Sequence, residues 1–189
     1  YSAQATMRVL RVRPYLSGQQ VKLKVNDVAF EIYLSLIGEF QLFNALAALG
    51  LVSAEEGSEI ENYLKGLDKL KGVPGRLEHI GTHPTGAPIV IDYAHTPDAI
   101  KNILTSLNNL KKNRIISIIG CGGDRDKGKR ALLTKQALLL SDIVILADDN
   151  PRNEEPEKIR QEMLHNLSKK QKEKIVNIGD RKQAIKYGI

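Results

Sequence analysis

A glycine-rich loop crowded with charged side chains occupies residues 120–130, with the sequence Gly-Cys-Gly-Gly-Asp-Arg-Asp-Lys-Gly-Lys-Arg. The apolar run 115–119 precedes it, and a helix-like pattern follows over residues 132–140. A strand, a glycine loop and a helix in this order bring backbone N–H groups and the positive end of a helix to one point. We therefore expect the loop to form the floor of a site for an anionic or zwitterionic ligand.

Two other interpretations of this loop have to be weighed. The spacing Gly123-x-x-x-x-Gly128-Lys129 matches a nucleotide-binding P-loop, but Arg130 stands where the motif needs a Ser or Thr hydroxyl for Mg²⁺. The four intervening residues are charged, whereas a loop that wraps phosphate with its backbone amides tolerates bulky acidic side chains poorly. A charged turn without any ligand is the other alternative, because loops commonly carry solvated charge.

Two further polar loops, residues 92–98 and 148–154, also follow apolar strand-like runs. Ligands of open α/β sheets bind outside the carboxyl ends of the strands. All three loops are therefore expected to converge on one site.

The side chains of these loops suit an amino acid. Arg125 and Arg152 offer planar forks for carboxylates, and Asp149 and Asn150 offer acceptors for ammonium groups. A ligand with both groups fits this mixture better than a phosphate ester alone. Residues 153–155 also stand where helix-capping residues belong, and both interpretations can hold together.

Other candidate residues keep two interpretations each. Asn44 lies in an apolar helical pattern, where a buried amide either contacts adenine or ribose or bonds a neighbouring loop. Arg76 follows a flexible glycine and either clamps a phosphate or pairs with Glu78.

Titratable residues offer a second set of alternatives. His95, near Asp92 at a predicted strand end, is either a phosphate contact or a general acid/base. Cys121 is either a nucleophile among basic neighbours or a small residue in a tight turn. No Cys/His spacing indicates a zinc site, and no metal ligand is predicted.

Composition limits the classes of function. The 189 residues are 42% hydrophobic and 26% charged, which is ordinary for a globular protein with a core. The net charge of +6 comes with lysine runs that lack interleaved aromatics, so nucleic-acid binding is not expected. A single cysteine suits a reducing compartment, and no membrane span or signal peptide is evident. The chain lacks an initiator Met, so we expect it to begin inside a longer protein.

Hydrophobic periodicity predicts an α/β fold. Residues 1–37 alternate as a small antiparallel β-meander, and helices are predicted over 38–54 and 58–67. A Gly-Val-Pro-Gly hinge at residues 72–75 precedes strands at 89–91, 115–119, 143–147 and 175–178 that alternate with helices. This pattern predicts a doubly wound, Rossmann-like, mostly parallel sheet, with domains at residues 1–72 and 73–189.

Five motifs in order resemble the Mur ligases, the ATP-dependent amide-forming enzymes of peptidoglycan synthesis. Residues 38–48 are similar to the family's Gly-x-Phe-Asn-x-x-Asn helix, 73–78 to its Gly-Arg-hydrophobic-Glu hinge, and 92–98 to its Asp-Tyr-Ala-His-Thr-Pro-Asp loop. Residues 120–130 and 149–152 are similar to the member that adds meso-diaminopimelate. The resemblance covers most of the chain.

The resemblance implies a mechanism and roles for particular residues. ATP with Mg²⁺ would phosphorylate the glutamate carboxylate of UDP-N-acetylmuramoyl-L-alanyl-D-glutamate, and the amine of meso-diaminopimelate would attack the acyl phosphate. Asn44 would contact the adenine and Arg76 the γ-phosphate, while Asp92 and His95 would line the nucleotide side of the cleft. Arg76 and His95 are the implied catalytic residues.

The resemblance also implies the amino-acid site. Arg125 and the loop of Asp149, Asn150, Pro151 and Arg152 would hold the incoming amino acid. Members that take meso-diaminopimelate carry Arg in this Asp-Asn-Pro-Arg motif, whereas lysine-adding members generally do not. Its charge suits the distal carboxylate that lysine lacks. A cytoplasmic monomer is implied.

Departures from the family pattern limit these expectations. Gln41 stands where the family usually has the first Asn of its helix motif, which weakens the adenine assignment. The family's P-loop, carbamylated lysine and metal ligands would lie upstream of residue 1, so we expect the chain by itself to be inactive. Alternatives are a non-catalytic α/β module that binds an amino acid or nucleotide, and a domain of a folylpolyglutamate-synthase-like ligase.

Overall fold

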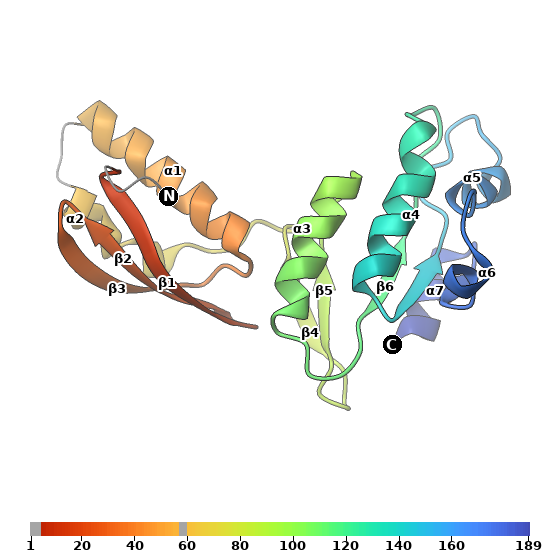
Figure 1. The fold of residues 1–189 in the computed structure, drawn as a ribbon, viewed down its shortest axis with the longest axis horizontal. Helices are drawn as coiled ribbons and strands as arrows, with labels where there is room; N and C mark the ends of the chain where they lie inside the picture. Colours follow the sequence, from red (N-terminus) through yellow and green to blue (C-terminus); the bar gives the residue numbers. More distant parts are fainter. Residues whose placement is uncertain (1–4, 57–59) are drawn as a thin grey trace. The chain divides into compact units, whose positions relative to one another are not determined.

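The computed structural model describes residues 5–56 and 60–189, and the chain divides into two compact units, Tyr1–Tyr93 and Ala94–Ile189 (Figure 1). They are named the N-terminal unit and the C-terminal unit below. The predicted domain boundary between residues 72 and 73 falls within the N-terminal unit and stays a prediction. In the described part of the chain, no helix combines the length and apolar composition needed to cross a membrane.

Three antiparallel strands begin the N-terminal unit: β1 (Met7–Tyr15), β2 (Gly18–Val25) and β3 (Val28–Leu34). The turn between β2 and β3 is Asn26-Asp27, with φ of +44° and +71°. Positive φ at both central residues is the geometry of a tight two-residue hairpin, and Asn and Asp tolerate it. The predicted β-meander is confirmed.

Helix α1 (Glu39–Glu56) packs on one face of this sheet. Val21, Leu23 and Val25 alternate along β2 and are fully buried, because side chains two residues apart share a face. The apolar stripe of α1 completes this core with Leu42, Ala45, Leu46 and Leu49.

One buried amide fixes the chain where it enters α1. Gln19 is 1% exposed, and its Nε2 donates hydrogen bonds to the carbonyl oxygens of Leu36 and Gly38, each at 2.9 Å. A buried amide is costly unless it is paired, so this residue ties β2 to the start of the helix.

The chain then forms α2 (Ile60–Leu64), the 3₁₀ helix η1 (Leu67–Lys69), and a hairpin of β4 (Glu78–Thr82) and β5 (Pro88–Ile91). The helix predicted over 58–67 is shorter, and its first two residues lie outside the described residues. The strand predicted at 89–91 exists, but it pairs antiparallel with β4 and not with the parallel sheet.

The C-terminal unit is built on three parallel strands in the order β6 (Ile116–Ile119), β7 (Ile143–Leu146) and β8 (Ile175–Asn177). Its helices are α3 (Pro97–Asn108), α4 (Gly128–Leu140), α5 (Pro156–Met163), α6 (Lys169–Lys172) and α7 (Arg181–Gly188). Thr96 caps α3 by accepting the Ala99 N–H at 3.3 Å, as its position before a proline predicts.

Helices cover both faces of this sheet. Val144 and Leu146 share one core with α3, α4 and α5, whereas Ile145 and Ala147 pack with Ala184 of α7 in a second core. A parallel sheet buried on both faces explains why its strands are continuous apolar runs. The predicted doubly wound α/β fold is confirmed.

Leu133 and Leu132 are neighbours on α4 with opposite exposure, 1% and 53%. Leu133→Ala is expected to lower the free energy of unfolding of the C-terminal unit by about 2–5 kcal/mol, because it leaves a cavity. Leu132→Ala is the matched control and should stay within about 0.5 kcal/mol of the parent. Urea denaturation followed by circular dichroism measures both, and equal losses would contradict this packing of α4.

Candidate functional site

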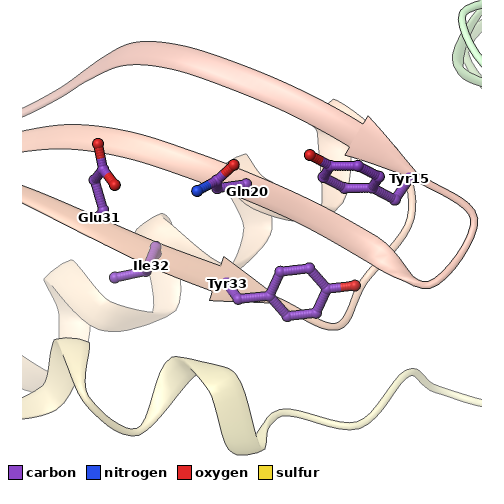
Figure 2. A pocket seen from close by; sticks show the side chains of 5 residues that line it. All are labelled: Tyr15, Gln20, Glu31, Ile32 and Tyr33. Atoms are coloured by element: carbon purple, nitrogen blue, oxygen red, sulfur yellow. The ribbon is translucent and has the colours of Figure 1, made fainter.

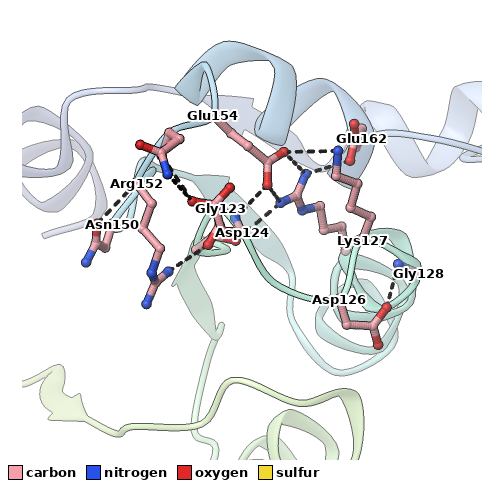
Figure 3. A network of polar contacts seen from close by, with 12 residues as sticks. Gly123, Asp124, Asp126, Lys127, Gly128, Asn150, Arg152, Glu154 and Glu162 are labelled. Carbon is pink, nitrogen blue, oxygen red and sulfur yellow. Dashed lines mark hydrogen bonds and ion pairs between the residues drawn. The ribbon is translucent and has the colours of Figure 1, made fainter.

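Two loops meet at the carboxyl edge of the parallel sheet (Figure 3). One, residues 120–127, follows β6, and the other, residues 147–155, follows β7. Because the two strands are parallel neighbours, both loops leave the sheet at the same edge. The Gly123 N–H donates a hydrogen bond to the Asn150 carbonyl at 2.9 Å, which joins the loops directly.

Glycine permits this close approach of two backbones. A Cβ at Gly123 would lie 1.8 Å from the Pro151 carbonyl oxygen, and a Cβ at Gly120 would lie 2.5 Å from the Ala147 carbonyl oxygen. No side chain fits at either place unless the backbone moves. These glycines therefore serve the docking of one loop on the other.

Four predicted amino-acid-binding residues form one turn: Asp149, Asn150, Pro151 and Arg152. The Asn150 N–H donates to the Asp149 carboxylate at 2.8 Å, and the Arg152 N–H donates to the Asn150 side-chain oxygen at 3.3 Å. Arg152 has φ of +50°, and its Nη1 donates to the Gly123 carbonyl at 2.7 Å. The structure brings these residues together, and their contacts with a ligand stay predictions.

Arg125, the remaining predicted substrate residue, is exposed in the glycine loop between two engaged acids. Asp124, at φ of +52°, accepts hydrogen bonds from the Asn153 N–H at 3.3 Å and Nδ2 at 2.8 Å. Asp126 accepts the Gly128 N–H at 2.9 Å. The acids fix the shape of the loop, while the Arg125 side chain reaches solvent.

The residue that joins the two loops most strongly was not among the predicted site residues. Arg130, the third residue of α4, is 0% exposed. Its Nη1 donates to Glu154 at 3.0 Å and to Glu162 at 2.6 Å. Its Nη2 donates to Glu154 at 2.8 Å and to the Gly122 carbonyl at 3.3 Å. The sequence presents Arg130 only as a misfit to the P-loop pattern, because nothing in it indicates that the side chain is buried.

These contacts hold both partners in their charged forms. Hydrogen bonds from Arg130 and from the Asp124 N–H lower the pKa of Glu154 from 4.5 to about 2. The hydrogen bond to Glu154, together with that to Glu162, raises the pKa of Arg130. The Lys127 ammonium lies 3.5 Å from the Glu154 carboxylate and adds to the attraction.

Residues 153–155 were predicted to cap the next helix. The prediction is wrong for Asn153 and Glu154, and only Glu155 occupies the N-cap position. Glu155 is the N-cap residue of α5, but among the described contacts its side chain bonds no helix N–H. Glu154 turns back to Arg130, and Pro156 begins the helix instead. A proline there needs no N–H partner, which lowers the demand for a cap.

A second polar cluster lies at the same edge of the sheet. Asp148 forms an ion pair with Arg160, whose Nε donates to the Asn177 side chain at 2.8 Å. Arg181 donates to the Asp148 carbonyl at 3.2 Å. Nearby Cys121 is buried, and this burial raises the pKa of its thiol, which disfavours the nucleophile interpretation.

In the N-terminal unit, a second arginine is held beside a strained residue. The Arg76 guanidinium carbon lies 5.0 Å from the centroid of the Tyr93 ring, a cation–π contact. The next residue, Leu77, is buried at φ of +49°, and its N–H donates to the Asp92 carboxylate at 2.7 Å. Glu78, the alternative partner of Arg76, accepts a backbone N–H at 2.7 Å.

The other predicted nucleotide residues lie on surfaces. Asn44 is exposed on α1, and its Nδ2 donates to the Gln41 side chain at 3.1 Å, so the expectation of a buried amide is wrong. His95 is exposed in the C-terminal unit, directly before Thr96. The nucleotide contacts of Asn44, Arg76 and His95 stay predictions.

A surface depression of about 340 Å³ lies on the β-meander of the N-terminal unit (Figure 2). It is lined by Tyr15, Gln20, Glu31, Ile32 and Tyr33. None of the predicted site residues is among them, so this depression is not part of the candidate site. Within residues 5–56 and 60–189, no group of three or more His, Cys, Asp or Glu could hold a metal ion.

The chain is similar to a family of known ligases. The family model described as "Mur ligase, glutamate ligase domain" matches residues 75–189. A UDP-N-acetylmuramoyl-L-alanyl-D-glutamate–2,6-diaminopimelate ligase of Mesorhizobium japonicum is 44% identical over 171 residues, which are 90% of this chain and 34% of that relative. The chain thus spans about a third of the length of the curated relatives it matches.

Solved structures agree with this relationship. One of a UDP-N-acetylmuramoyl-L-alanyl-D-glutamate–2,6-diaminopimelate ligase has a TM-score of 0.66 at 34% identity, covering 98% of this chain and 37% of its own. Mycobacterium tuberculosis folylpolyglutamate synthase complexed with ADP has a TM-score of 0.75 at 22% identity, covering 98% and 40%, and shows the shared fold alone. The α/β fold of the C-terminal unit and the family match over residues 75–189 identify this part of the chain as a ligase domain. The chain belongs to the Mur ligase family, which confirms the resemblance of its motifs.

Gly123→Ala is expected to displace the loop that contains Arg152, because its Cβ would overlap the Pro151 carbonyl oxygen. The strain should lower the free energy of unfolding by about 1–3 kcal/mol. Gly128→Ala is the control, since its Cβ would meet only the end of the Asp126 side chain, at 3.2 Å. Denaturant unfolding and backbone amide chemical shifts measure both variants, and equal behaviour would contradict the docking of the loops.

The low pKa of Glu154 makes stability depend on pH. A carboxyl whose pKa falls on folding stabilises the folded state above its unfolded pKa, and the contribution disappears as pH falls through the folded pKa. With values of 4.5 unfolded and about 2 folded, the loss should occur between these two pH values. The Tm of the parent should therefore fall more steeply across this window than that of Glu154→Gln, which has no carboxyl there. Parallel Tm curves would contradict the ion pair.

Proposed function

We propose that this chain supplies the amino-acid-binding part of an ATP-dependent ligase. The reaction joins meso-diaminopimelate to the glutamate carboxylate of UDP-N-acetylmuramoyl-L-alanyl-D-glutamate. The observation that carries the proposal is the turn of Asp149, Asn150, Pro151 and Arg152 at the carboxyl end of β7, where the exposed residue Arg152 lies beside carboxylate and amide acceptors. The names of the relatives support the same reaction.

The chemistry of diaminopimelate matches this turn. The molecule carries an ammonium and a carboxylate at each end, and lysine lacks the distal carboxylate. Arg152 donates one N–H to the Gly123 carbonyl, and a guanidinium has five donors, so others remain for a carboxylate. We assign the distal carboxylate to Arg152, a second anionic group to Arg125, and ammonium groups to Asp149 and Asn150.

The reaction has two covalent steps. The acceptor carboxylate attacks the γ-phosphorus of ATP, ADP leaves, and an acyl phosphate forms. The uncharged amine of the amino acid then attacks the carbonyl carbon, and phosphate leaves as the amide forms and the nitrogen loses a proton. Residues 149–152 would act by holding this amine in place, which converts a bimolecular encounter into an oriented one.

The nucleotide side is assigned to other residues of the chain. Arg76 would pair with the γ-phosphate, where its charge offsets the negative charge of phosphoryl transfer, and its stacking on Tyr93 limits its orientation before ATP binds. Asn44 would contact the adenine, and Asp92 and His95 would line the nucleotide cleft. Mg²⁺, when bound, would neutralise phosphate charge.

We also propose that residues 1–72 belong to a central ATP-binding domain and residues 73–189 to the amino-acid-binding domain. The second range begins two residues before the family match at residue 75. Since ATP and a UDP-linked precursor of peptidoglycan are the substrates, we place the reaction in the cytoplasm, performed by a monomer.

Isothermal titration calorimetry of the chain with meso-diaminopimelate and with L-lysine tests the assignment of Arg152. Diaminopimelate should bind about 10–100-fold tighter than lysine, because a charge-assisted pair with the distal carboxylate is lost in lysine. Arg152→Ala should abolish this preference and leave lysine binding unchanged. Arg114→Ala, at an exposed residue before β6, is the control and should keep it.

Three outcomes would contradict the proposal. Equal or tighter binding of lysine would exclude the diaminopimelate assignment. Absence of binding to either amino acid would show that the described residues do not hold the amino acid. Binding of nucleotide alone, or of glutamate in preference to diaminopimelate, would favour a nucleotide-binding module or a folylpolyglutamate-synthase-like ligase.

A further inference from the structure

Arg130 has no route to a substrate. Its side chain is 1% exposed, and its two terminal nitrogens donate to Glu154, Glu162 and the Gly122 carbonyl. A guanidinium buried in this way is tolerated only because carboxylates pair with it. Whatever Arg130 contributes to the reaction must pass through these partners.

The two carboxylates that pair with Arg130 differ in what else they bind. Glu154 also accepts the Asp124 N–H at 2.7 Å and lies 3.5 Å from the Lys127 ammonium, so it binds the glycine loop at three places. Glu162 lies within α5, and its described contact is with Arg130. Only Glu154 connects the guanidinium to both loops.

Glu154 stands two residues after Arg152 in the same loop. Its N–H donates to the Pro151 carbonyl at 3.0 Å, so a displaced Glu154 would pull on the turn that presents Arg152. On the facing loop, the Asp124 carboxylate binds Asn153 at 2.8 Å. The contacts of Glu154 and Asp124 therefore flank Arg152 on its carboxyl-terminal side.

The backbone at the contact is strained on both sides. Asp124 and Arg152 have φ of +52° and +50°, a region that residues with a side chain adopt only when the surroundings impose it. Glu154 accepts the N–H of Asp124 and stands two residues after Arg152, so its contact with Arg130 lies close to both strained residues.

We propose that Arg130 is a positioning residue for amino-acid specificity: by holding Glu154, it fixes the turn in which Arg152 meets the distal carboxylate of the incoming amino acid. The ligand in this statement rests on the proposed function, whereas the placement of the loop by Arg130 does not. Because its side chain is buried, Arg130 acts through Glu154 and is not assigned a catalytic role.

Glu154→Gln and Glu162→Gln form a matched pair of variants. Each variant replaces one of the two carboxylates that pair with Arg130 by an amide. Only Glu154→Gln also disturbs the contact with the glycine loop. Hydrogen exchange of the Gly123, Asp124 and Glu154 amides should become about tenfold faster or more in Glu154→Gln, as expected for loss of a charge-assisted bond. In Glu162→Gln these amides should exchange as in the parent.

Substitution of the arginine itself supplies a rescue test. Arg130→Met should accelerate exchange of the same loop amides, and Arg130→Lys, which keeps the charge, should restore part of the protection. Lys111→Met is the control, because it removes the Lys111–Asp142 ion pair of the same unit outside these two loops. Amides of β7 serve as the internal reference for global unfolding.

Ligand binding by these variants completes the test. Glu154→Gln should lose the preference for meso-diaminopimelate over lysine by about tenfold or more, and Glu162→Gln should keep it. If the parent binds neither amino acid, the proposed function fails, and the exchange data still decide whether Arg130 places the loop. Equal effects of both glutamate variants, or acceleration of the β7 amides in parallel with the loop, would show that Arg130 only stabilises the fold and would overturn the proposal.

Discussion

The buried pairing of Arg130 with Glu154 is the interaction on which the carboxyl edge of the sheet depends. A guanidinium without water must find acceptors, and one of the two carboxylates that pair with it belongs to the loop after the neighbouring strand. The demand of one buried charge thus selects where that loop lies. Glycines at the contact allow the backbones to touch, so electrostatics and close packing act on the same few residues.

Two of the three candidate ligand-binding arginines, Arg76 and Arg152, are presented in the same way. Arg152 and the residue after Arg76 have positive φ. In each case a carboxylate remote in sequence accepts a nearby backbone N–H at 2.7 Å: Glu154 for Asp124, and Asp92 for Leu77. Strained backbone of this kind persists where the surroundings over-determine it, and it is frequent at functional sites. The rigid scaffold therefore limits the positions open to each cationic side chain.

Prediction of secondary structure from the sequence succeeded where the local hydrophobic pattern alone decides the element. The β-meander and the buried parallel strands at 115–119, 143–147 and 175–178 are confirmed, because each follows from local preferences. Prediction failed where a partner had to be chosen. A short β-branched run at 89–91 indicates a strand but not its neighbour, and β5 pairs in a hairpin. Asn44 lies in an apolar pattern, yet the exposed side of α1 carries it.

The sequence by itself determined the fold class, the family and the loops that carry the candidate site, since periodicity and motif spacing are local properties of the chain. Only the tertiary structure decided that Arg130 is buried, that Glu154 binds it and does not cap α5, and that Arg152 rests on the Gly123 carbonyl. Burial and pairing of charge depend on which segments meet in space. That information is spread over residues 122–162, and no single stretch of the chain contains it.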